Sequence, residues 1–117
     1  MKTMVLFCMS TALFSAGAAY AAHAKLVRSV PEAGSVINGP PTTFVLEFSE
    51  YVRLRQVYVK TDDGKETLLH NLPQSDLKTI TLPAPSLPAG HYVLEWQVFT
   101  HDSYALNGHF QFTVSTQ

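Results

Sequence analysis

Histidine is the residue type in this sequence with the clearest metal-binding chemistry. The chain contains five histidines, which are His23, His70, His91, His101 and His109. His23 is the most informative, because it follows directly on a segment with the character of a secretory signal. If cleavage makes His23 the first residue, its α-amino nitrogen and its imidazole nitrogen can chelate one metal ion together. Two nitrogen donors in one plane suit Cu(II), which prefers tetragonal N/O coordination.

A second group of candidate ligands follows a predicted strand that ends at Thr100. His101 and Asp102 supply an imidazole and a carboxylate in a loop at one end of the domain, and such loops commonly carry function. His70 and His91 lie in no recognisable motif. We interpret His70 as a turn residue and His91 as an outward-facing strand residue, because histidine is often simply a surface residue.

The N-terminal segment has the order of a secretory signal. Lys2 is followed by the apolar run Met4–Phe14 and then by mostly small residues up to Ala22. The apolar run is shorter than the roughly 20 residues that cross a bilayer, which disfavours the alternative of a membrane anchor. We therefore predict that residues 1–22 are a signal peptide removed on export to the periplasm, and that residues 23–117 form one domain.

The exact cleavage position is open. Cutting after Ala21 places Ala19 and Ala21 at the two positions where small residues are preferred. Cutting after Ala22 places the bulky Tyr20 at one of them, but only this cut makes His23 the terminus. A retained Ala22 would move the free amine one residue away and remove the two-donor chelate.

All sulfur-containing residues lie in the predicted signal: Met1, Met4, Cys8 and Met9. Cleavage would therefore leave neither a disulfide nor the thiolate and thioether ligands that favour Cu(I). If the protein binds copper, we expect a Cu(II) protein with little affinity for Cu(I).

Charge and motif content exclude other classes of function. The formal net charge is −1 and no basic run is present, so we expect no nucleic-acid partner. The chain also has no Gly-rich phosphate loop after a strand and no recognisable Ser-His-Asp arrangement. We therefore expect a binding protein and not an enzyme.

Short runs with period-two alternation, separated by Pro, Gly and Asn, predict an all-β fold. Phe44, Leu46 and Phe48 face one way while Glu47 and Ser49 face the other. Trp96 lies in the middle of a long predicted strand. The pattern resembles a seven-stranded immunoglobulin-like Greek-key β-sandwich. The predicted strands are approximately Lys25–Val30, Thr43–Ser49, Arg55–Thr61, Glu66–His70, Lys78–Leu82, His91–Thr100 and His109–Ser115.

Several segments together resemble the CopC copper-resistance family. They occur in the family's order and span nearly the whole predicted mature chain, which makes the combination specific. The family's members are periplasmic copper carriers with a β-sandwich fold, so the resemblance implies the same fold and role here. The segments are His23–Val27, Ser29–Ser35, Leu46–Glu50, Leu87–Trp96 and Gly108–Val114.

The resemblance also implies a site. In the family, Cu(II) is held by the N-terminal His and by an Asp-x-His pair in the loop after the Trp strand. Here His23 and Asp102 fill two of these positions, but Tyr104 stands where the second His is expected. His101, His109, the Tyr104 phenol or a water molecule are the alternatives for the third ligand. We take His23, Asp102 and His101 as the predicted metal ligands.

The resemblance places Glu50 near the same loop, where it could orient a ligand from outside the coordination sphere. We predict a monomeric Cu(II) carrier or chaperone for copper tolerance or delivery, which could exchange copper with an inner-membrane copper transporter. Two alternatives stay open. One is an interaction module whose metal site has decayed, which the Tyr104 substitution motivates. The other is a copper oxygenase of the kind that also binds its metal through an N-terminal His.

Overall fold

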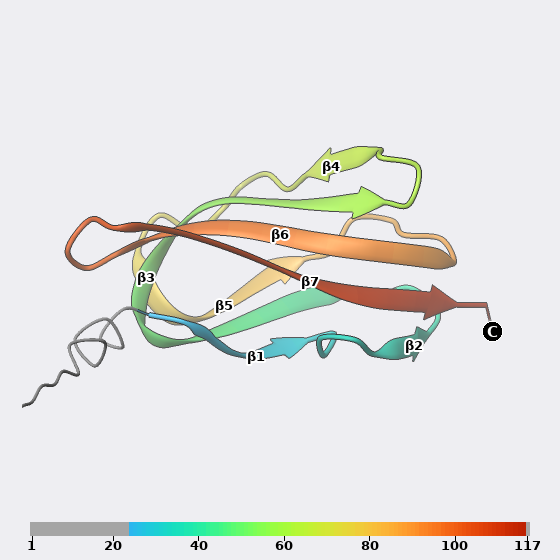
Figure 1. The fold of residues 1–117 in the computed structure, drawn as a ribbon, viewed down its shortest axis with the longest axis horizontal. Coiled ribbons are helices and arrows are strands. Elements are labelled where there is room, and N and C mark those ends of the chain that lie inside the picture. Colours follow the sequence, from blue (N-terminus) through green and yellow to red (C-terminus); the bar gives the residue numbers. More distant parts are fainter. Residues whose placement is uncertain (1–23, 117) are drawn as a thin grey trace, which may run out of the picture.

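The computed structural model describes residues 24–116, which form strands and loops (Figure 1). His23, the predicted signal and Gln117 lie outside the described residues. Within the described part, no helix has the length and apolar character needed to cross a membrane. The strands are β1 (Leu26–Val30), β2 (Val36–Asn38), β3 (Thr43–Thr61), β4 (Glu66–Leu68), β5 (Asp76–Pro83), β6 (Gly90–Thr100) and β7 (Ala105–Ser115).

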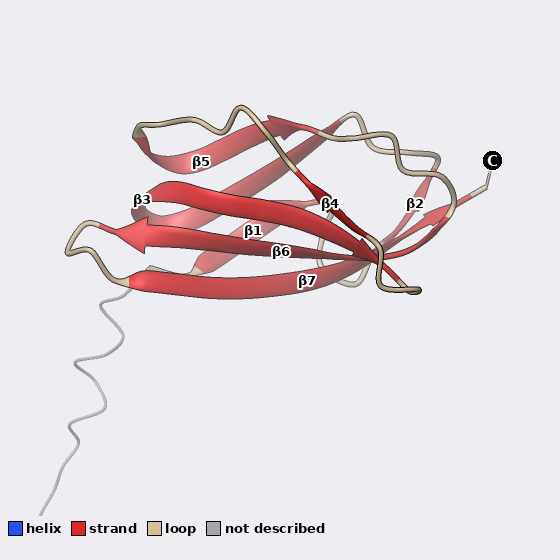
Figure 2. Ribbon diagram, turned by 90° about the horizontal axis from the view of Figure 1, so that it is seen from above, coloured by secondary structure: helices blue, strands red, loops and turns tan. Residues whose placement is uncertain are grey.

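The long strand β3 takes part in both layers of the fold. Its first half pairs antiparallel with β1 and β5, and its second half pairs antiparallel with β6 and β4. β6 continues the second layer to β7, and β2 adds to β7 in parallel. Figures 1 and 2 show β3 curving from one layer into the other. The predicted all-β sandwich is therefore confirmed.

Parts of the strand prediction were wrong. The predicted strands Thr43–Ser49 and Arg55–Thr61 are the two halves of β3, which continues through residues 50–54, where Val52 and Leu54 are buried. Register shifts between Glu47 and Val52 and between Leu54 and Gln56 accompany the change of partner strands. The sequence analysis also missed β2, because three residues are too few to show a periodic pattern.

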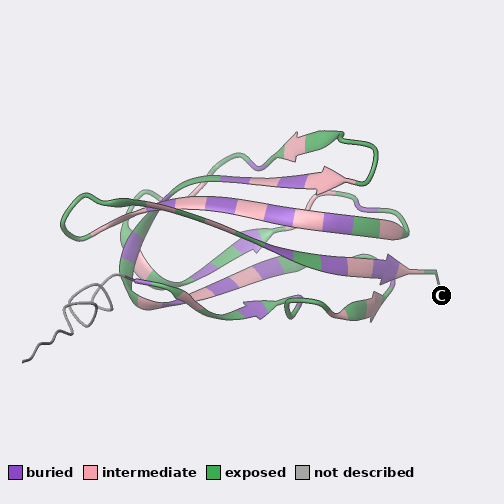
Figure 3. Cartoon of the chain, viewed as in Figure 1, coloured by how far each residue is buried: buried purple, intermediate pink, exposed green. Residues whose placement is uncertain are grey.

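Alternation along the strands builds the core, as the sequence predicted. Phe44, Leu46 and Phe48 are each at most 2% exposed. The Phe44 ring meets the Phe112 ring edge-on at a centroid distance of 5.8 Å, which joins the first layer to β7. Figure 3 shows the buried residues alternating along the central strands. Aromatic edge-to-face packing thus holds the two layers together.

Trp96 packs against a position that has no side chain. Its ring lies edge-on to Phe48 at 5.0 Å, and Trp96 pairs directly with Gly108 on β7. A Cβ atom placed on Gly108 would lie 2.1 Å from Cζ2 of Trp96, far inside van der Waals contact. The indole therefore occupies the space that any other residue at position 108 would need.

The outward face of the second layer carries a hydrogen-bonded carboxylate. The Tyr58 hydroxyl donates to Oε1 of Glu95 at 2.8 Å, and the Lys60 ammonium lies 3.2 Å from Oε2. The hydrogen bond from Tyr58, aided by Lys60, holds the pKa of Glu95 below its ordinary value. A carboxyl group with a lowered pKa in the folded state stabilises the fold above its unfolded pKa, and this contribution is lost as the pH falls.

We therefore expect Glu95→Gln to weaken the acid sensitivity of the protein. The unfolding free energy of the wild type should decline as the pH falls below about 4.3, the ordinary pKa of glutamate. The variant should decline less over the same range, as urea titrations at a series of pH values would measure. Glu32→Gln, which alters an exposed loop glutamate, is the matched control. Equal pH dependence in the Glu95 variant and the wild type would contradict this role.

Candidate metal centre

A tight loop between β6 and β7 carries the candidate ligands His101 and Asp102. The Thr100 amide donates to the Tyr104 carbonyl at 2.8 Å, and the Ser103 amide donates to the Thr100 carbonyl at 2.9 Å. Ser103 adopts a positive φ of 69°, which closes the turn. The loop thus folds back within four residues, and it presents successive side chains at one end of the sandwich.

The side chain of Thr100 organises this loop. Its hydroxyl donates to Oδ1 of Asp102 and accepts from the Tyr104 amide at 3.1 Å. Hydroxyl groups at turns commonly bond to nearby backbone in this way. The Asp102 carboxylate is therefore held by a local hydrogen bond. Its side chain is solvent-exposed, as the side chain of a metal ligand at a loop can be.

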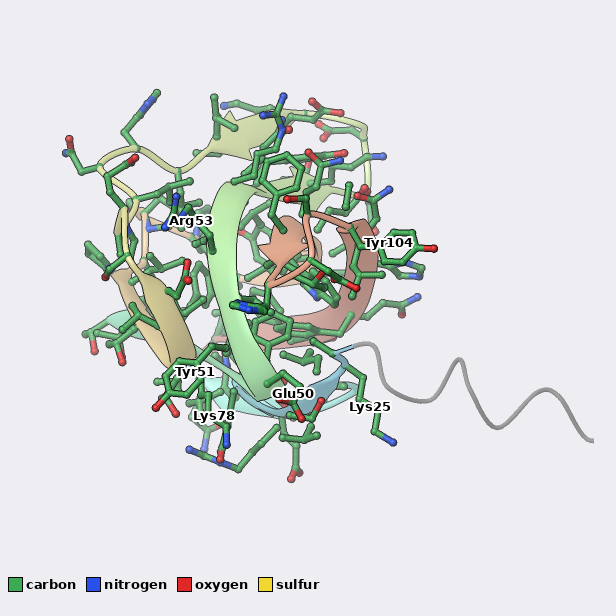
Figure 4. All side chains as sticks on the ribbon, turned by 90° about the vertical axis from the view of Figure 1, so that its left-hand side faces the viewer. Lys25, Glu50, Tyr51, Arg53, Lys78 and Tyr104 are labelled. Atoms are coloured by element: carbon green, nitrogen blue, oxygen red, sulfur yellow. The ribbon has the colours of Figure 1, made fainter. Side chains whose placement is uncertain are left out.

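The loop offers its other two candidate ligands in different surroundings. His101 lines a surface pocket of about 280 Å³ together with Arg53, Asp76 and Phe99. Arg53 and Asp76 form an ion pair at 3.1 Å. Figure 4 shows Arg53 and Tyr104 on opposite sides of this end of the molecule. His101 thus borders the Arg53 side, whereas Tyr104, which is 53% exposed, lies on the other.

The start of the described chain is fixed at the same end. The Lys25 amide donates to Oγ of Ser49 at 3.0 Å, and the Ser49 amide donates to the Lys25 carbonyl at 2.9 Å. Ala24 is only 7% exposed and belongs to the hydrophobic core. Figure 4, which looks onto this end, shows Lys25 near Glu50, with Tyr104 farther away on the same side as Lys25. His23 lies outside the described residues, so its part in the site stays a prediction.

Sequence reasoning missed the contact between Lys25 and Ser49. Ser49 belongs to the predicted strand Thr43–Ser49, and the pattern indicated only that its side chain faces away from the core. Nothing in the sequence shows that its hydroxyl meets a backbone amide 24 residues earlier. Glu50 is exposed and lies at this end, and its predicted role in orienting a ligand stays a prediction.

The remaining histidines lie elsewhere. Nδ1 of His91 lies 2.9 Å from the Thr113 hydroxyl. His70 is exposed in the loop after β4. His109 was expected to begin the last strand near the metal loop, but β7 begins at Ala105, and His109 pairs with Glu95 well inside the strand. His109 is five positions along the chain from Tyr104, about 16 Å at the usual rise of a strand.

Within residues 24–116, no three side chains of His, Cys, Asp or Glu are grouped in a way that could hold a metal ion. His23, the first ligand of the predicted site, lies outside the described residues, so the predicted ligand set of His23, Asp102 and His101 stays a prediction.

The comparisons with known proteins decide the family. The protein-family model of the CopC domain matches residues 26–115 of the sequence. This chain belongs to the CopC family. Copper resistance protein C of Escherichia coli is 30% identical to this CopC chain over 104 residues. The match covers 80% of this chain and 82% of that protein. Protein YobA of Escherichia coli strain K12 is 32% identical over 98 residues. That match covers 80% of this chain and 79% of YobA.

Solved structures support the same assignment. CopC from Methylosinus trichosporium OB3b superposes with a TM-score of 0.71 at 26% identity, covering 81% of this chain and 96% of that one. PcoC, a methionine rich copper resistance protein from Escherichia coli, superposes with a TM-score of 0.59 at 28% identity, covering 80% and 100%. Unlike that methionine rich protein, this CopC chain has no methionine within the matched residues 26–115.

Proposed function

We propose that this protein is a periplasmic Cu(II)-binding carrier that serves copper tolerance or copper delivery. In this proposal residues 1–22 are removed on export, and residues 23–117 are the mature protein. His23, Asp102 and His101 are the proposed ligands. Membership of the CopC family and the similarity to a copper resistance protein support the choice of copper.

The observation that carries the proposal is the anchoring of Lys25 at the end of the sandwich that bears the β6–β7 loop (Figure 4). Two residues of chain span at most about 7 Å. A terminus at His23 therefore stays close to the anchored Lys25. In this proposal the amine and the imidazole of His23 bind the ion together with the carboxylate of Asp102.

The donor chemistry supports Cu(II) over Cu(I). Nitrogen and carboxylate donors suit Cu(II), whereas thiolate and thioether donors favour Cu(I). The described residues contain neither cysteine nor methionine. The ligands proposed here include no methionine, whereas PcoC is called a methionine rich copper resistance protein.

The third ligand is proposed to be His101, because its imidazole is adjacent to Asp102 in the same loop. Tyr104 is the alternative on the opposite side, and its phenol would have to lose a proton that ordinarily has a pKa of about 10. A water molecule completes the coordination if neither side chain binds. We further propose that the carrier is monomeric and exchanges its ion with an inner-membrane copper transporter.

The proposal predicts that the exported protein takes up one Cu(II) ion. The protein should be isolated from the periplasm of a producing cell and its intact mass measured with and without Cu(II), and with Cu(I) under reducing conditions. We expect a mass corresponding to residues 23–117, one bound Cu(II) and no stable Cu(I) complex. Weak uptake without a defined stoichiometry would contradict the carrier role and favour an interaction module. Copper-dependent oxidation of a polysaccharide would instead indicate an oxygenase.

A further inference from the structure

Ser49 makes an unusual pair of contacts with the residue that precedes β1. Its amide donates to the Lys25 carbonyl, and its hydroxyl accepts from the Lys25 amide. The regular pairing of β1 with β3 ends at Leu26 and Phe48. The Ser49 side chain therefore supplies the acceptor for a backbone amide that lies beyond the regular ladder. Both backbone polar groups of Lys25 are held by this single residue.

The neighbouring residue Ala24 is held by a different force. It is 7% exposed and packs in the hydrophobic core. Hydrogen bonds at Lys25 and apolar burial at Ala24 thus fix two successive residues. Only His23 of the proposed mature chain lies beyond these two anchors. The described chain is therefore held at both of the residues that would directly follow a mature N-terminus at His23.

We infer that Ser49 is a positioning residue for the Cu(II) site, and that its hydroxyl sets the affinity without touching the metal. The inference rests on the proposed function. Ligands held in place before the metal arrives lose less freedom on binding, so the affinity is higher. Loss of a group that orients a metal ligand typically weakens metal binding by about 10- to 100-fold.

Ser49→Ala removes only the hydroxyl. The variant keeps the Ser49 amide, and so the hydrogen bond to the Lys25 carbonyl, but it leaves the Lys25 amide without its acceptor. Ser49→Thr keeps a hydroxyl on a β-branched side chain that suits a strand. Ser115→Ala is the matched control, because the Ser115 hydroxyl also bonds to backbone, at the Ile37 carbonyl near the opposite end of the molecule.

The experiment is a competitive titration of each processed variant with the aqueous Cu(II) ion against a coloured chelator, together with the electron paramagnetic resonance spectrum of the bound ion. We expect about 10-fold weaker binding and an altered spectrum for Ser49→Ala. Ser49→Thr and Ser115→Ala should match the wild type in both. Amide hydrogen exchange at Lys25 should be faster in Ser49→Ala than in the wild type, with or without copper.

The outcomes separate this inference from the proposed function. If His23→Ala loses Cu(II) while Ser49→Ala binds with the affinity and spectrum of the wild type, the positioning role is wrong and the proposed site stands. If the wild type binds no Cu(II), the proposed function fails and the inference fails with it. Equal loss of affinity in Ser49→Ala and Ser115→Ala would indicate a general effect on the fold and would also overturn the positioning role.

Discussion

His23→Ala is expected to remove most of the Cu(II) affinity of the processed protein. The substitution keeps the α-amine and Asp102 but deletes the imidazole, so the two-nitrogen chelate can no longer form. The loss should exceed the roughly 10- to 100-fold that removal of an orienting group costs, because a ligand itself is lost. Competitive titration of the purified, correctly processed variant measures the change.

His70→Ala is the matched control for this prediction. It removes an exposed imidazole from the loop after β4 and leaves the residues at the β6–β7 loop unchanged. A second informative variant retains Ala22 as its first residue, which separates the free amine from the imidazole of His23. We expect this variant to bind Cu(II) as weakly as His23→Ala does. Full affinity in either His23→Ala or the Ala22-extended protein would show that the N-terminal chelate is not the site.

Gly108→Ala is expected to destabilise the fold by about 3 kcal/mol, the upper part of the usual range for overpacking a core. The added Cβ would lie 2.1 Å from Cζ2, 2.6 Å from Cε2 and 2.8 Å from Cη2 of Trp96. These atoms belong to the rigid indole, which is already packed edge-on to Phe48. The ring cannot move aside without disturbing both layers. Urea unfolding followed by Trp96 fluorescence would measure the loss.

Two further variants test the cause of this destabilisation. Gln111→Ala, at an exposed position on the same strand, should change stability by no more than about 0.5 kcal/mol. Combining Gly108→Ala with Trp96→Phe should cost less than the sum of the two single changes, because the smaller ring relieves the clash. This comparison requires unfolding to be followed by circular dichroism, since Trp96 is the only tryptophan. Strict additivity of the two changes would rule out the clash as the cause.

The sequence was sufficient for much of the core and for the position of Asp102 in a loop between two strands. Alternation identified Phe44, Leu46 and Phe48 as buried because a half-buried strand has a strict period of two. Asp102 was expected in a loop at one end, and it lies there. The continuity of β3 was not predicted, because Glu50 and Tyr51 are adjacent exposed residues that interrupt the period-two pattern.

Contacts between distant residues account for what the sequence could not supply. The bonds between Lys25 and Ser49 depend on how β1 aligns with β3, and no local pattern encodes that alignment. The distance of His109 from the loop depends on where β7 begins, and boundaries of strands are poorly defined by pattern alone. The identity of the third ligand stays a prediction, because it depends on the directions in which the side chains of the β6–β7 loop point.

The participation of β3 in both layers affects how the domain unfolds. Four of the other strands, β1, β4, β5 and β6, pair directly with β3. Loss of either layer would expose the core that the two layers share and would leave half of β3 without its partner strands. The domain should therefore unfold as one cooperative unit, as small single domains commonly do. If the protein carries copper as proposed, we expect no stable half-open form, and the ion should enter and leave at the end of the intact sandwich.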